Sequence, residues 1–409
     1  MKIFGEHDEK TVAQFQDVRS RAVDAALMAD GHVGYVMPIG GVAAYREQVS
    51  VVGVGFDIAC GNAAIRTDRR LADLGGTEAE LRAALAGIAD EIERTVSFGV
   101  GRKNRADDAP VDHELFGDPA WEAVPAKHRQ ALLTKARQQL GTVGSGNHYV
   151  DVFSDEAGML WVGVHFGSRG FGHTVASGFL ALQAGKPWGE RAPEREVLLD
   201  LRAPIGHDYW QLMTLAGRYA YAGREWVARK VVAILGAREM ELVHNHHNFA
   251  WRETHGGEEL IVVRKGATPA FPEQPGFIGG SMGDDAVIVR GTPAEDGTPE
   301  SVLVAQREAL YSTVHGAGRV MSRTQAAGKV HRRTGEVLQP GRVTPEMMHE
   351  WLREKDVVLR GGGLDESPHA YRRLPAVLAA QQGTVQVRHT LRPLVVVMAG
   401  AKEFDPYKD

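Results

Sequence analysis

Apolar residues recur at helical spacing in four parts of the chain, and these segments predict helices. Their apolar side chains fall largely on one face, as expected for a helix that packs one side against a core. One of the segments also carries a start signal, because Thr77 and Glu80 stand at the spacing of a capping box. The expected helices cover residues 11–29, 78–96, 125–140 and 206–235.

Short apolar runs predict buried strands that lead into glycine-rich loops. Such runs start at Val51, at Leu160 and at Ala286. The glycines and proline of residues 28–42 predict a loop or turn between short strands. Within it Asp30 and His32 alternate, so on an extended chain both side chains face the same side.

The glycine loops carry side chains that could meet at one centre. Asp57 and Cys60 are three residues apart, so both can point at a common centre if the turn after the strand is helical. His246 and His247 are adjacent and diverge, so at most one of them faces such a centre. The recurring arrangement is a strand followed by a glycine loop with a His, Asp or Cys, and it occurs at Asp57, Cys60, His148, His165, His247 and His315.

This set of residues is the type that binds metal ions and phosphate. Four imidazoles, one thiolate and one carboxylate suffice for two metal ions, with Cys60 able to bridge them. Glycine loops with unpaired N–H groups bind anions, and Arg169, Arg319 and Arg323 can neutralise phosphates. The donor types fit zinc or iron as readily as manganese. Taken singly, an Asp-x-x-Cys pair or one histidine is more often a structural feature of a core, and only their recurrence favours a shared site.

The composition limits the classes of function. The formal net charge is −5, which argues against binding of polyanions through bulk charge, so any nucleic-acid contact must come from local patches. One such patch is the basic run at Arg102, Lys103 and Arg105, which could grip a phosphate backbone or simply be solvated. A single cysteine excludes a disulfide framework and fits a reducing compartment. No signal peptide and no apolar run of membrane-spanning length is visible, and a cytoplasmic protein is expected.

In the order and number of its motifs the chain resembles the RtcB family of RNA ligases over nearly its whole length. The similar motifs include Asp-Gly-His-Val-Gly-Tyr at 30–35, Gly-Phe-Asp-Ile-Ala-Cys-Gly at 55–61 and Gly-Ser-Gly-Asn-His at 144–148. They continue with His-Phe-Gly-Ser-Arg-Gly at 165–170, His-His-Asn at 246–248, Arg-Lys-Gly-Ala at 264–267, Gly-Ser-Met-Gly at 280–283 and His-Gly-Ala-Gly-Arg at 315–319.

The resemblance implies an enzyme that joins an RNA 2′,3′-cyclic phosphate or 3′-phosphate end to a 5′-hydroxyl end, using GTP and two Mn²⁺ ions, in tRNA splicing or RNA repair. His315 would be the nucleophile that takes GMP onto its imidazole. The implied metal ligands are Asp57, Cys60, His148, His165 and His247. The residues implied to hold the guanylate are Asn147, Ser281, His315, Gly316, Ala317, Gly318 and Tyr371. The resemblance also suggests an activating helper protein of the archease type. It suggests no membrane partner.

Two other functions would use the same residues differently. A metal-dependent cyclic phosphodiesterase, or phosphate-end hydrolase, would need the metals but not GTP. A non-catalytic RNA-end binder would have the same fold but carry out no reaction. The intact set of candidate ligands argues against this function. Because the candidates run from Asp57 to His315, one site draws on most of the chain. We therefore expect residues 1–409 to form a single α+β catalytic domain with mixed β-sheets around a central metal and nucleotide site.

The chain also departs from the family pattern around the expected nucleotide. Gly279 stands where a proline is usual, Ala286 where a serine can contact the guanine, and Asp151 replaces a glutamate. The C-terminal lysine expected beside the nucleotide is missing in the region of Met398, and Lys402 is the candidate substitute. These changes bear on guanine contacts and leave the metal set untouched.

Overall fold

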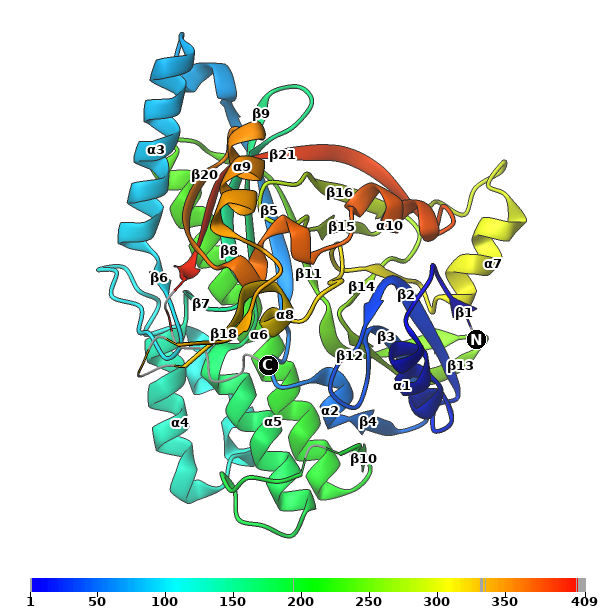
Figure 1. The fold of residues 1–409 in the computed structure, drawn as a ribbon. Coiled ribbons are helices and arrows are strands. Elements are labelled where there is room, and N and C mark those ends of the chain that lie inside the picture. Colours follow the sequence, from blue (N-terminus) through cyan, green and yellow to red (C-terminus); the bar gives the residue numbers. More distant parts are fainter. Residues whose placement is uncertain (1, 194, 332–333, 335, 402, 404–409) are drawn as a thin grey trace.

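The structure is a computed structural model, and it describes residues 2–193, 195–331, 334, 336–401 and 403 (Figure 1). Helices and strands alternate irregularly, which confirms the predicted α+β class. The helices are α1 (Glu9–Arg19), α2 (Val51–Val54), α3 (Glu78–Thr95), α4 (Ala126–Gln139), α5 (Arg169–Gln183), α6 (Pro204–Ile234), α7 (Glu300–Glu308), α8 (Arg323–Ala327), α9 (Pro345–Glu354) and α10 (Leu374–Ala380).

The larger sheet has eight strands in the order β11-β5-β9-β8-β21-β16-β15, with β20 pairing in parallel on β21. Apolar residues of β5, β8, β9 and β21 pack on one face against α3 and α6, and form one of the hydrophobic cores. These strands are β5 (Gly61–Arg70), β8 (Tyr149–Ser154), β9 (Met159–Phe166), β11 (Glu239–His246), β15 (Pro275–Ile278), β16 (Ala286–Gly291), β20 (Val358–Gly362) and β21 (Val385–Gly400).

The second sheet has five strands in the order β1-β2-β3-β13-β12, and β12 follows directly after β11 of the larger sheet. The chain therefore passes from one sheet to the other at His247. Its strands are β1 (Lys2–Ile3), β2 (Asp24–His32), β3 (Ile39–Tyr45), β12 (Asn248–His255) and β13 (Glu258–Lys265). Two-stranded pairs are β4 (Gln48–Ser50) with β10 (Leu198–Asp200), β6 (Ser97–Phe98) with β7 (Thr142–Gly144), β14 (Ala267–Pro269) with β17 (Ser312–Val314), and β18 (Gly328–Val330) with β19 (Val337–Pro340).

Three of the four predicted helices are confirmed as α3, α4 and α6. The start of α3 has the predicted capping box, in which Thr77 Oγ1 accepts from the Glu80 N–H and the Glu80 carboxylate accepts from the Thr77 N–H. The long helix α6 buries much of its length against both α5 and the larger sheet.

The prediction of one helix over residues 11–29 is wrong beyond Arg19. The chain turns there, and residues from Asp24 onward form β2, which lies between β1 and β3. Residues 25 to 31 of β2 are buried, so the apolar run that looked like a continued helical face fills a strand covered on both sides. The predicted loop at 28–42 shrinks to the six residues between β2 and β3.

The prediction of a strand starting at Val51 is also wrong, because residues 51–54 form the short helix α2. Ser50 supplies the N-cap, and its Oγ accepts from the Gly53 N–H at 2.8 Å. The predicted loop after His165 is short as well, since α5 begins at Arg169.

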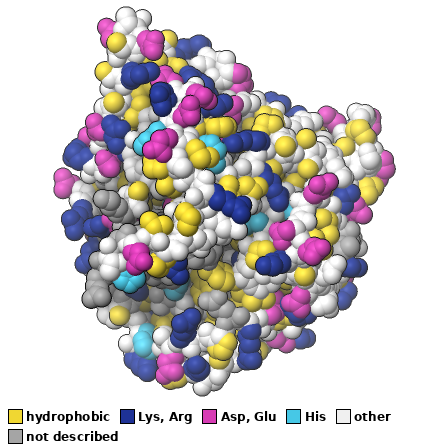
Figure 2. Space-filling view, in the orientation of Figure 1, with side chains coloured by type: hydrophobic (Ala, Val, Ile, Leu, Met, Phe, Trp, Pro, Cys, Tyr) yellow, Lys and Arg dark blue, Asp and Glu magenta, His cyan; other side chains and the backbone are white. Residues whose placement is uncertain are grey.

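Acidic and basic side chains are interspersed over the face in Figure 2, in keeping with the small net charge. Among the described residues, the structure contains no helix of the length and apolar character needed to span a membrane.

Candidate functional site

A cavity of about 290 Å³ lies where the two sheets meet, and the predicted site residues line it. The cavity wall includes the five expected metal ligands Asp57, Cys60, His148, His165 and His247. It also includes the expected nucleotide contacts Asn147, Ser281, His315, Gly316, Ala317, Gly318 and Tyr371. Segments that are far apart in the sequence therefore converge on one place, as the recurring strand-and-loop pattern predicts.

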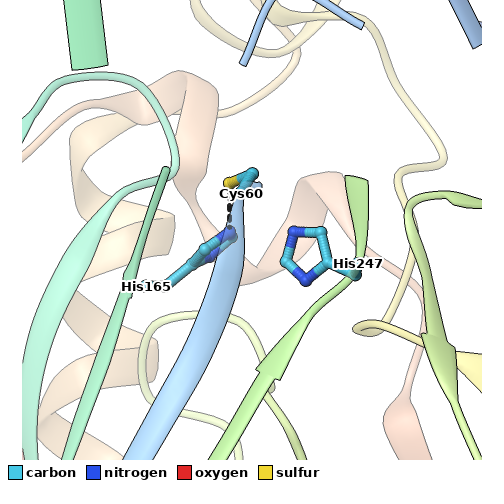
Figure 3. Close-up of side chains that lie close together, drawn as sticks. All are labelled: Cys60, His165 and His247. Carbon is cyan, nitrogen blue, oxygen red and sulfur yellow. Dashed lines mark hydrogen bonds between the residues drawn. The ribbon is translucent and has the colours of Figure 1, made fainter. Parts of the chain in front are cut away.

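Cys60, His165 and His247 form one cluster of potential metal ligands (Figure 3). One ligand atom from each lies within 4.8 Å of the other two, and Cys60 Sγ is 3.2 Å from His165 Nε2. All three side chains are buried. The Nδ1 atom of His247 has no hydrogen-bond partner among the described residues, which is unusual for a buried polar atom. A cation bound between the three would supply the missing interactions.

Asp57, Cys60 and His148 form a second cluster of the same kind. His148 Nε2 is 3.1 Å from Asp57 Oδ2 and 3.6 Å from Cys60 Sγ. Cys60 belongs to both clusters, so its sulfur stands where a ligand shared by two ions would be. The Asp57–Cys60 turn is not the helical turn that the sequence analysis required, because Ala59 within it has φ 61°, although the Cys60 N–H donates to the Asp57 carbonyl at 3.0 Å. Both side chains nevertheless reach one centre.

The charges of these side chains suit cation binding. Burial, together with the neighbouring His148 and His315, holds the pKa of His165 well below its ordinary value, and burial does the same for His247. Both imidazoles are therefore neutral, the form that binds metals. Burial raises the pKa of Asp57, but the neighbouring His148, Arg169 and Cys60 together outweigh it, so the pKa lies below its ordinary value and the carboxylate is ionised. Burial and the Asp57 charge raise the pKa of Cys60, so a bound cation would be needed to stabilise its thiolate.

Further hydrogen bonds fix the direction of the ligands. The His148 Nδ1–H donates to the Val143 carbonyl at 2.9 Å, which leaves the lone pair of Nε2 facing Asp57 and Cys60. A fully buried arginine from α6, Arg224, donates to the carbonyls of Ala59 and Phe166. Burial lowers the pKa of Arg224 only to about 10, so its guanidinium stays charged. The sequence analysis missed Arg224, because it stands in a helix interpreted as core packing.

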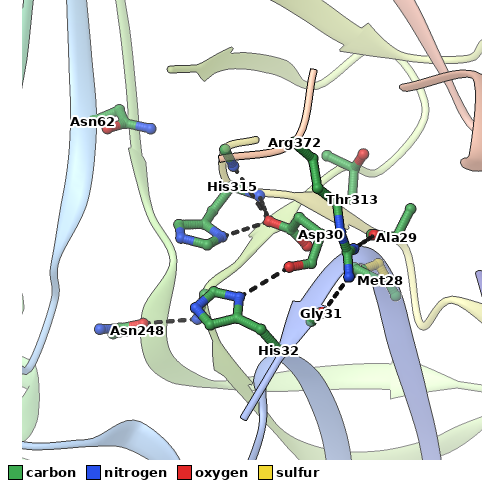
Figure 4. A network of polar contacts seen from close by, with 12 residues as sticks. Met28, Ala29, Asp30, Gly31, His32, Asn62, Asn248, Thr313, His315 and Arg372 are labelled. Atoms are coloured by element: carbon green, nitrogen blue, oxygen red, sulfur yellow. Dashed lines mark hydrogen bonds and ion pairs between the residues drawn. The ribbon is translucent and has the colours of Figure 1, made fainter. Parts of the chain in front are cut away.

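His315 lies at the edge of the ligand clusters and is oriented by Asp30 (Figure 4). Asp30 Oδ2 is 2.7 Å from His315 Nδ1 and also accepts from the His315 backbone N–H at 3.1 Å. The His315 ring is 4.8 Å from the His247 ring, centroid to centroid. Since the Nδ1–H donates to Asp30, Nε2 carries the lone pair, as a nucleophilic imidazole requires. The sequence analysis singled out Asp30 for its alternation with His32 but did not connect it with His315.

The glycine loop after His315 is held against β2, the strand that carries Asp30. Gly318 has φ 75°, and a side chain at this position would overlap the Asp30 backbone. Arg372 closes the other side by donating to the carbonyls of Ala29 and Gly31. His32 also lines the cavity, and burial lowers its pKa to about 4, so it is neutral.

Beyond His315 the cavity wall contains a network of arginines and acids. Arg319 donates to the Tyr371 hydroxyl at 2.8 Å, and the Tyr371 hydroxyl donates to Glu366. Arg323 forms ion pairs with Asp365 and Glu366. Both arginines, predicted as phosphate partners, are thus already paired with protein groups. Arg169, the third predicted partner, stands beside the site, with Nη1 3.2 Å from His148 Nδ1.

Three positions where the chain departs from the RtcB pattern, Asp151, Gly279 and Met398, line the cavity. Val396 and Met398 pair with Asp151 and Tyr149 across β21 and β8, and all four line the cavity. Asp151 Oδ1 is buried and lacks a hydrogen-bond partner among the described residues. Burial raises the pKa of Asp151 well above its ordinary value, which favours the protonated carboxyl group. The absence of a large side chain at Gly279 leaves room for the Tyr149 hydroxyl.

Ala286 and the basic run at 102–105 lie away from the cavity wall. Ala286 is buried in an apolar cluster with Phe277 and Leu391 rather than lining the cavity. Lys402, the candidate substitute for the missing lysine, lies outside the described residues. The basic run at Arg102, Lys103 and Arg105 lines a separate surface groove that also contains acidic side chains.

Fold and site together define an α+β protein with a buried pocket of Cys, His and Asp side chains and an oriented imidazole at its edge. The family model described as "tRNA-splicing ligase RtcB" matches residues 10–399. The chain belongs to the RtcB family, the family of RNA- and tRNA-splicing ligases.

Curated relatives agree with this assignment. The chain is 33% identical to the RNA-splicing ligase RtcB of Escherichia coli (strain K12), over 91% of this chain and 89% of that protein. It is 33% identical to the tRNA-splicing ligase RtcB of Archaeoglobus fulgidus, over 91% and 87% of the two chains. The RNA-splicing ligase RtcB of Mycobacterium bovis is 29% identical, over 89% and 94%. The family predicted from the motifs is confirmed, and neither alternative function is favoured.

Proposed function

We propose that this RNA ligase joins a 3′-phosphate or 2′,3′-cyclic phosphate end of RNA to a 5′-hydroxyl end, with GTP as the energy source and two Mn²⁺ ions as cofactors. The observation that carries the proposal is the position of His315. Its Nδ1 is tied to Asp30 at 2.7 Å, and its ring lies beside His247 of the first ligand cluster. A nucleophile next to two potential cation sites is the arrangement that phosphoryl transfer needs.

The donor set fits two divalent ions. Cys60, His165 and His247 would hold one ion, and Asp57, Cys60 and His148 the other. The buried Nδ1 of His247 without a partner supports this assignment. When bound, such ions would neutralise phosphate charge and stabilise the attacking and leaving oxygens of an in-line displacement. The preference for manganese comes from the family resemblance, since the donor types alone also fit zinc or iron.

The role of His315 follows from its protonation. Nε2 attacks the α-phosphorus of GTP, an N–P bond forms, the bond to the bridging oxygen breaks, and pyrophosphate leaves. Because Nδ1–H already donates to Asp30, the ring needs no other base to free its lone pair. Asp30 also stabilises the positive charge that the ring gains on bonding to phosphorus.

The remaining steps transfer GMP to RNA and then release it. A cyclic phosphate is first opened by water to a 3′-monophosphate. That phosphate attacks the phosphorus on His315 and takes the GMP, and the 5′-hydroxyl oxygen then attacks the RNA phosphate and displaces GMP. The nucleotide would lie against Asn147, Ser281, Gly316, Ala317, Gly318 and Tyr371, which line the cavity around His315. We also propose that residues 1–409 act as one catalytic domain.

Covalent labelling tests the proposal. Purified protein incubated with Mn²⁺ and GTP radiolabelled at the α-phosphate is expected to retain label through denaturation, whereas the His315→Ala variant retains none. A wild-type protein that stays unlabelled, with and without an added archease-type helper protein, would contradict the His315 step. GTP labelled at the γ-phosphate is the matched control, because its label leaves with pyrophosphate.

A second assay separates ligation from hydrolysis. RNA with a cyclic phosphate end and a second RNA with a 5′-hydroxyl end are incubated with Mn²⁺, with and without GTP. Joined product that depends on GTP is expected. Opened but unjoined ends, formed equally without GTP, would instead identify a phosphodiesterase.

A further inference from the structure

Arg224 is a fully buried cation that lies behind the ligand clusters rather than in the cavity. It comes from the middle of α6, and its side chain has no measurable exposure. The four acceptors of its guanidinium are neutral groups, two backbone carbonyls and two imidazoles. A buried guanidinium usually has an anionic partner, so this arrangement calls for an explanation.

The two carbonyl contacts join segments that carry different potential ligands. Arg224 Nη1 donates to the Ala59 carbonyl at 2.8 Å and to the Phe166 carbonyl at 2.6 Å. Ala59 immediately precedes Cys60, and Phe166 immediately follows His165. One nitrogen atom therefore fixes the spacing between the backbones of two ligand-bearing residues.

The third segment is attached through a histidine side chain. Arg224 Nη2 hydrogen-bonds to His246 Nδ1 at 2.9 Å, and His246 immediately precedes His247. The His246 ring stacks on Tyr221 of the same helix, with centroids 3.8 Å apart, which prevents it from turning away. Arg224 Nε also donates to His244 Nε2 at 2.9 Å. All three residues of the Cys60–His165–His247 cluster thus have a sequence neighbour bonded to one guanidinium.

The backbone next to Cys60 needs such support. Ala59 has φ 61°, a left-handed conformation that residues with a side chain rarely adopt. Its N–H donates to the Asn248 carbonyl at 2.7 Å, and its own carbonyl accepts from Arg224. The unfavourable conformation is therefore held from both sides, and it turns the chain so that Cys60 faces the cavity.

We propose that Arg224 is a positioning residue that holds Cys60, His165 and His247 at the spacing required for a shared cation. The proposal rests on the metal sites of the proposed function and adds to them a residue that touches neither metal nor substrate. A lysine could not replace it, because three nitrogens of the planar guanidinium act in fixed directions on three different segments.

Cobalt binding tests the role without relying on activity. Co²⁺ bound to a thiolate gives a sulfur-to-metal charge-transfer absorption, which reports ligation by Cys60. The Arg224→Lys variant keeps the positive charge, and it is expected to bind Co²⁺ about 10–100-fold more weakly than the wild type, the usual effect of removing an interaction that orients a ligand. The charge-transfer band is also expected to shift or weaken at saturation.

The control is an arginine of equal burial elsewhere in the molecule. Arg264 is also fully buried, but it bonds to Glu253, Ser312 and Leu310 and to none of the segments next to the ligands. Arg264→Lys is expected to lower thermal stability while leaving Co²⁺ affinity within about twofold. A folded Arg224→Lys variant with wild-type affinity and an unchanged band would overturn the proposal.

A milder pair of variants covers the case in which Arg224→Lys does not fold. His246→Leu removes the acceptor of Arg224 Nη2, whereas His246→Asn places an amide oxygen near the position of Nδ1. Weaker Co²⁺ binding in the leucine variant, with recovery in the asparagine variant, supports the proposal, and equal affinities overturn it.

The outcome is separable from that of the proposed function. A wild-type protein that binds Co²⁺ through Cys60 but neither takes up GMP nor joins RNA contradicts the reaction and leaves the role of Arg224 intact. A wild-type protein without a thiolate band contradicts both.

Discussion

Asp30 and His315, 285 residues apart in the sequence, are joined by a 2.7 Å contact between Oδ2 and Nδ1. The carboxylate is fully buried, and it also accepts from the backbone N–H of His315 and of Gly316. A residue of the second strand thereby sets both the tautomer and the direction of the imidazole proposed to attack GTP.

We therefore predict that Asp30→Asn lowers the rate of GMP labelling by about 10²–10⁴-fold, as is typical when a carboxylate that fixes a catalytic histidine is lost. The amide can donate to Nδ1, which would place the ring proton on Nε2 and block the attack. Labelling rates at saturating GTP measure the effect. Asp24→Asn, on the same strand but outside the cavity, is the control, and an Asp30→Asn variant as fast as this control would disprove the assignment.

Cys60 is predicted to control both metal sites, because its sulfur belongs to both ligand clusters. Cys60→Ala should lose both Mn²⁺ ions, whereas His148→Ala and His247→Ala should each lose one. Equilibrium dialysis followed by elemental analysis gives the number of ions per chain. A Cys60→Ala protein that retains one tightly bound ion would show that the clusters are independent.

The metal-free protein is predicted to lose stability as the pH falls from about 6.5 toward 4. Burial lowers the pKa of His244 to about 3 and that of His32 to about 4, both below the ordinary 6.5. As the pH falls, these histidines are protonated in the unfolded chain at a higher pH than in the folded protein, so acid favours unfolding. The free energy of unfolding falls by up to about 1.4 kcal/mol per pH unit for each such imidazole. Urea unfolding at several pH values measures this loss. It should be smaller in His244→Gln, and stability that is constant between pH 7 and 5 would contradict the prediction.

Asp151 is predicted to reduce the stability of the free protein. Its folded pKa is raised by burial, so burying the ionised carboxylate opposes folding wherever the pH lies above the ordinary pKa. Asp151→Asn should raise the free energy of unfolding by about 1 kcal/mol or more while weakening GTP binding, because a group lining the cavity is altered. Urea midpoints and nucleotide titrations measure the two effects.

Asp155 follows directly after β8, the strand that carries Asp151, but its carboxylate is well hydrogen-bonded. It accepts from two backbone N–H groups and from Trp161, and its pKa is lowered. Asp155→Asn should therefore destabilise the protein. Equal changes in the two variants would show that the unpartnered state of Asp151 is not the cause.

Sequence patterns predicted the elements whose signals are local. The capping box at Thr77 and the periodicity of residues 206–235 were sufficient for α3 and α6. The segment 11–29 failed because pairing of residues from Asp24 onward with β1 and β3 outweighs a helical spacing. At Val51 the decisive signal was a cap, Ser50, which was present in the sequence but not considered.

The sequence predicted those residues of the candidate site whose side-chain type alone indicates metal or phosphate binding. Cys and His next to glycine loops marked the expected ligands, and all of them line the cavity. Asp30 and Arg224 act through partners far away in the sequence, and no local pattern reveals such pairs. An arginine in an apolar helix is a weak signal that could have been noticed, because a charged residue on a buried face needs partners.

A residue late in the chain supports the early strand that carries Asp30. Arg372 bonds to the carbonyls of Ala29 and Gly31, on either side of the carboxylate that orients His315. A nascent polypeptide that has not yet released residue 372 from the ribosome therefore lacks the clamp around Asp30, although every expected metal ligand has already been made. The contacts that hold the backbone on both sides of Asp30 therefore form only after residue 372 has been made.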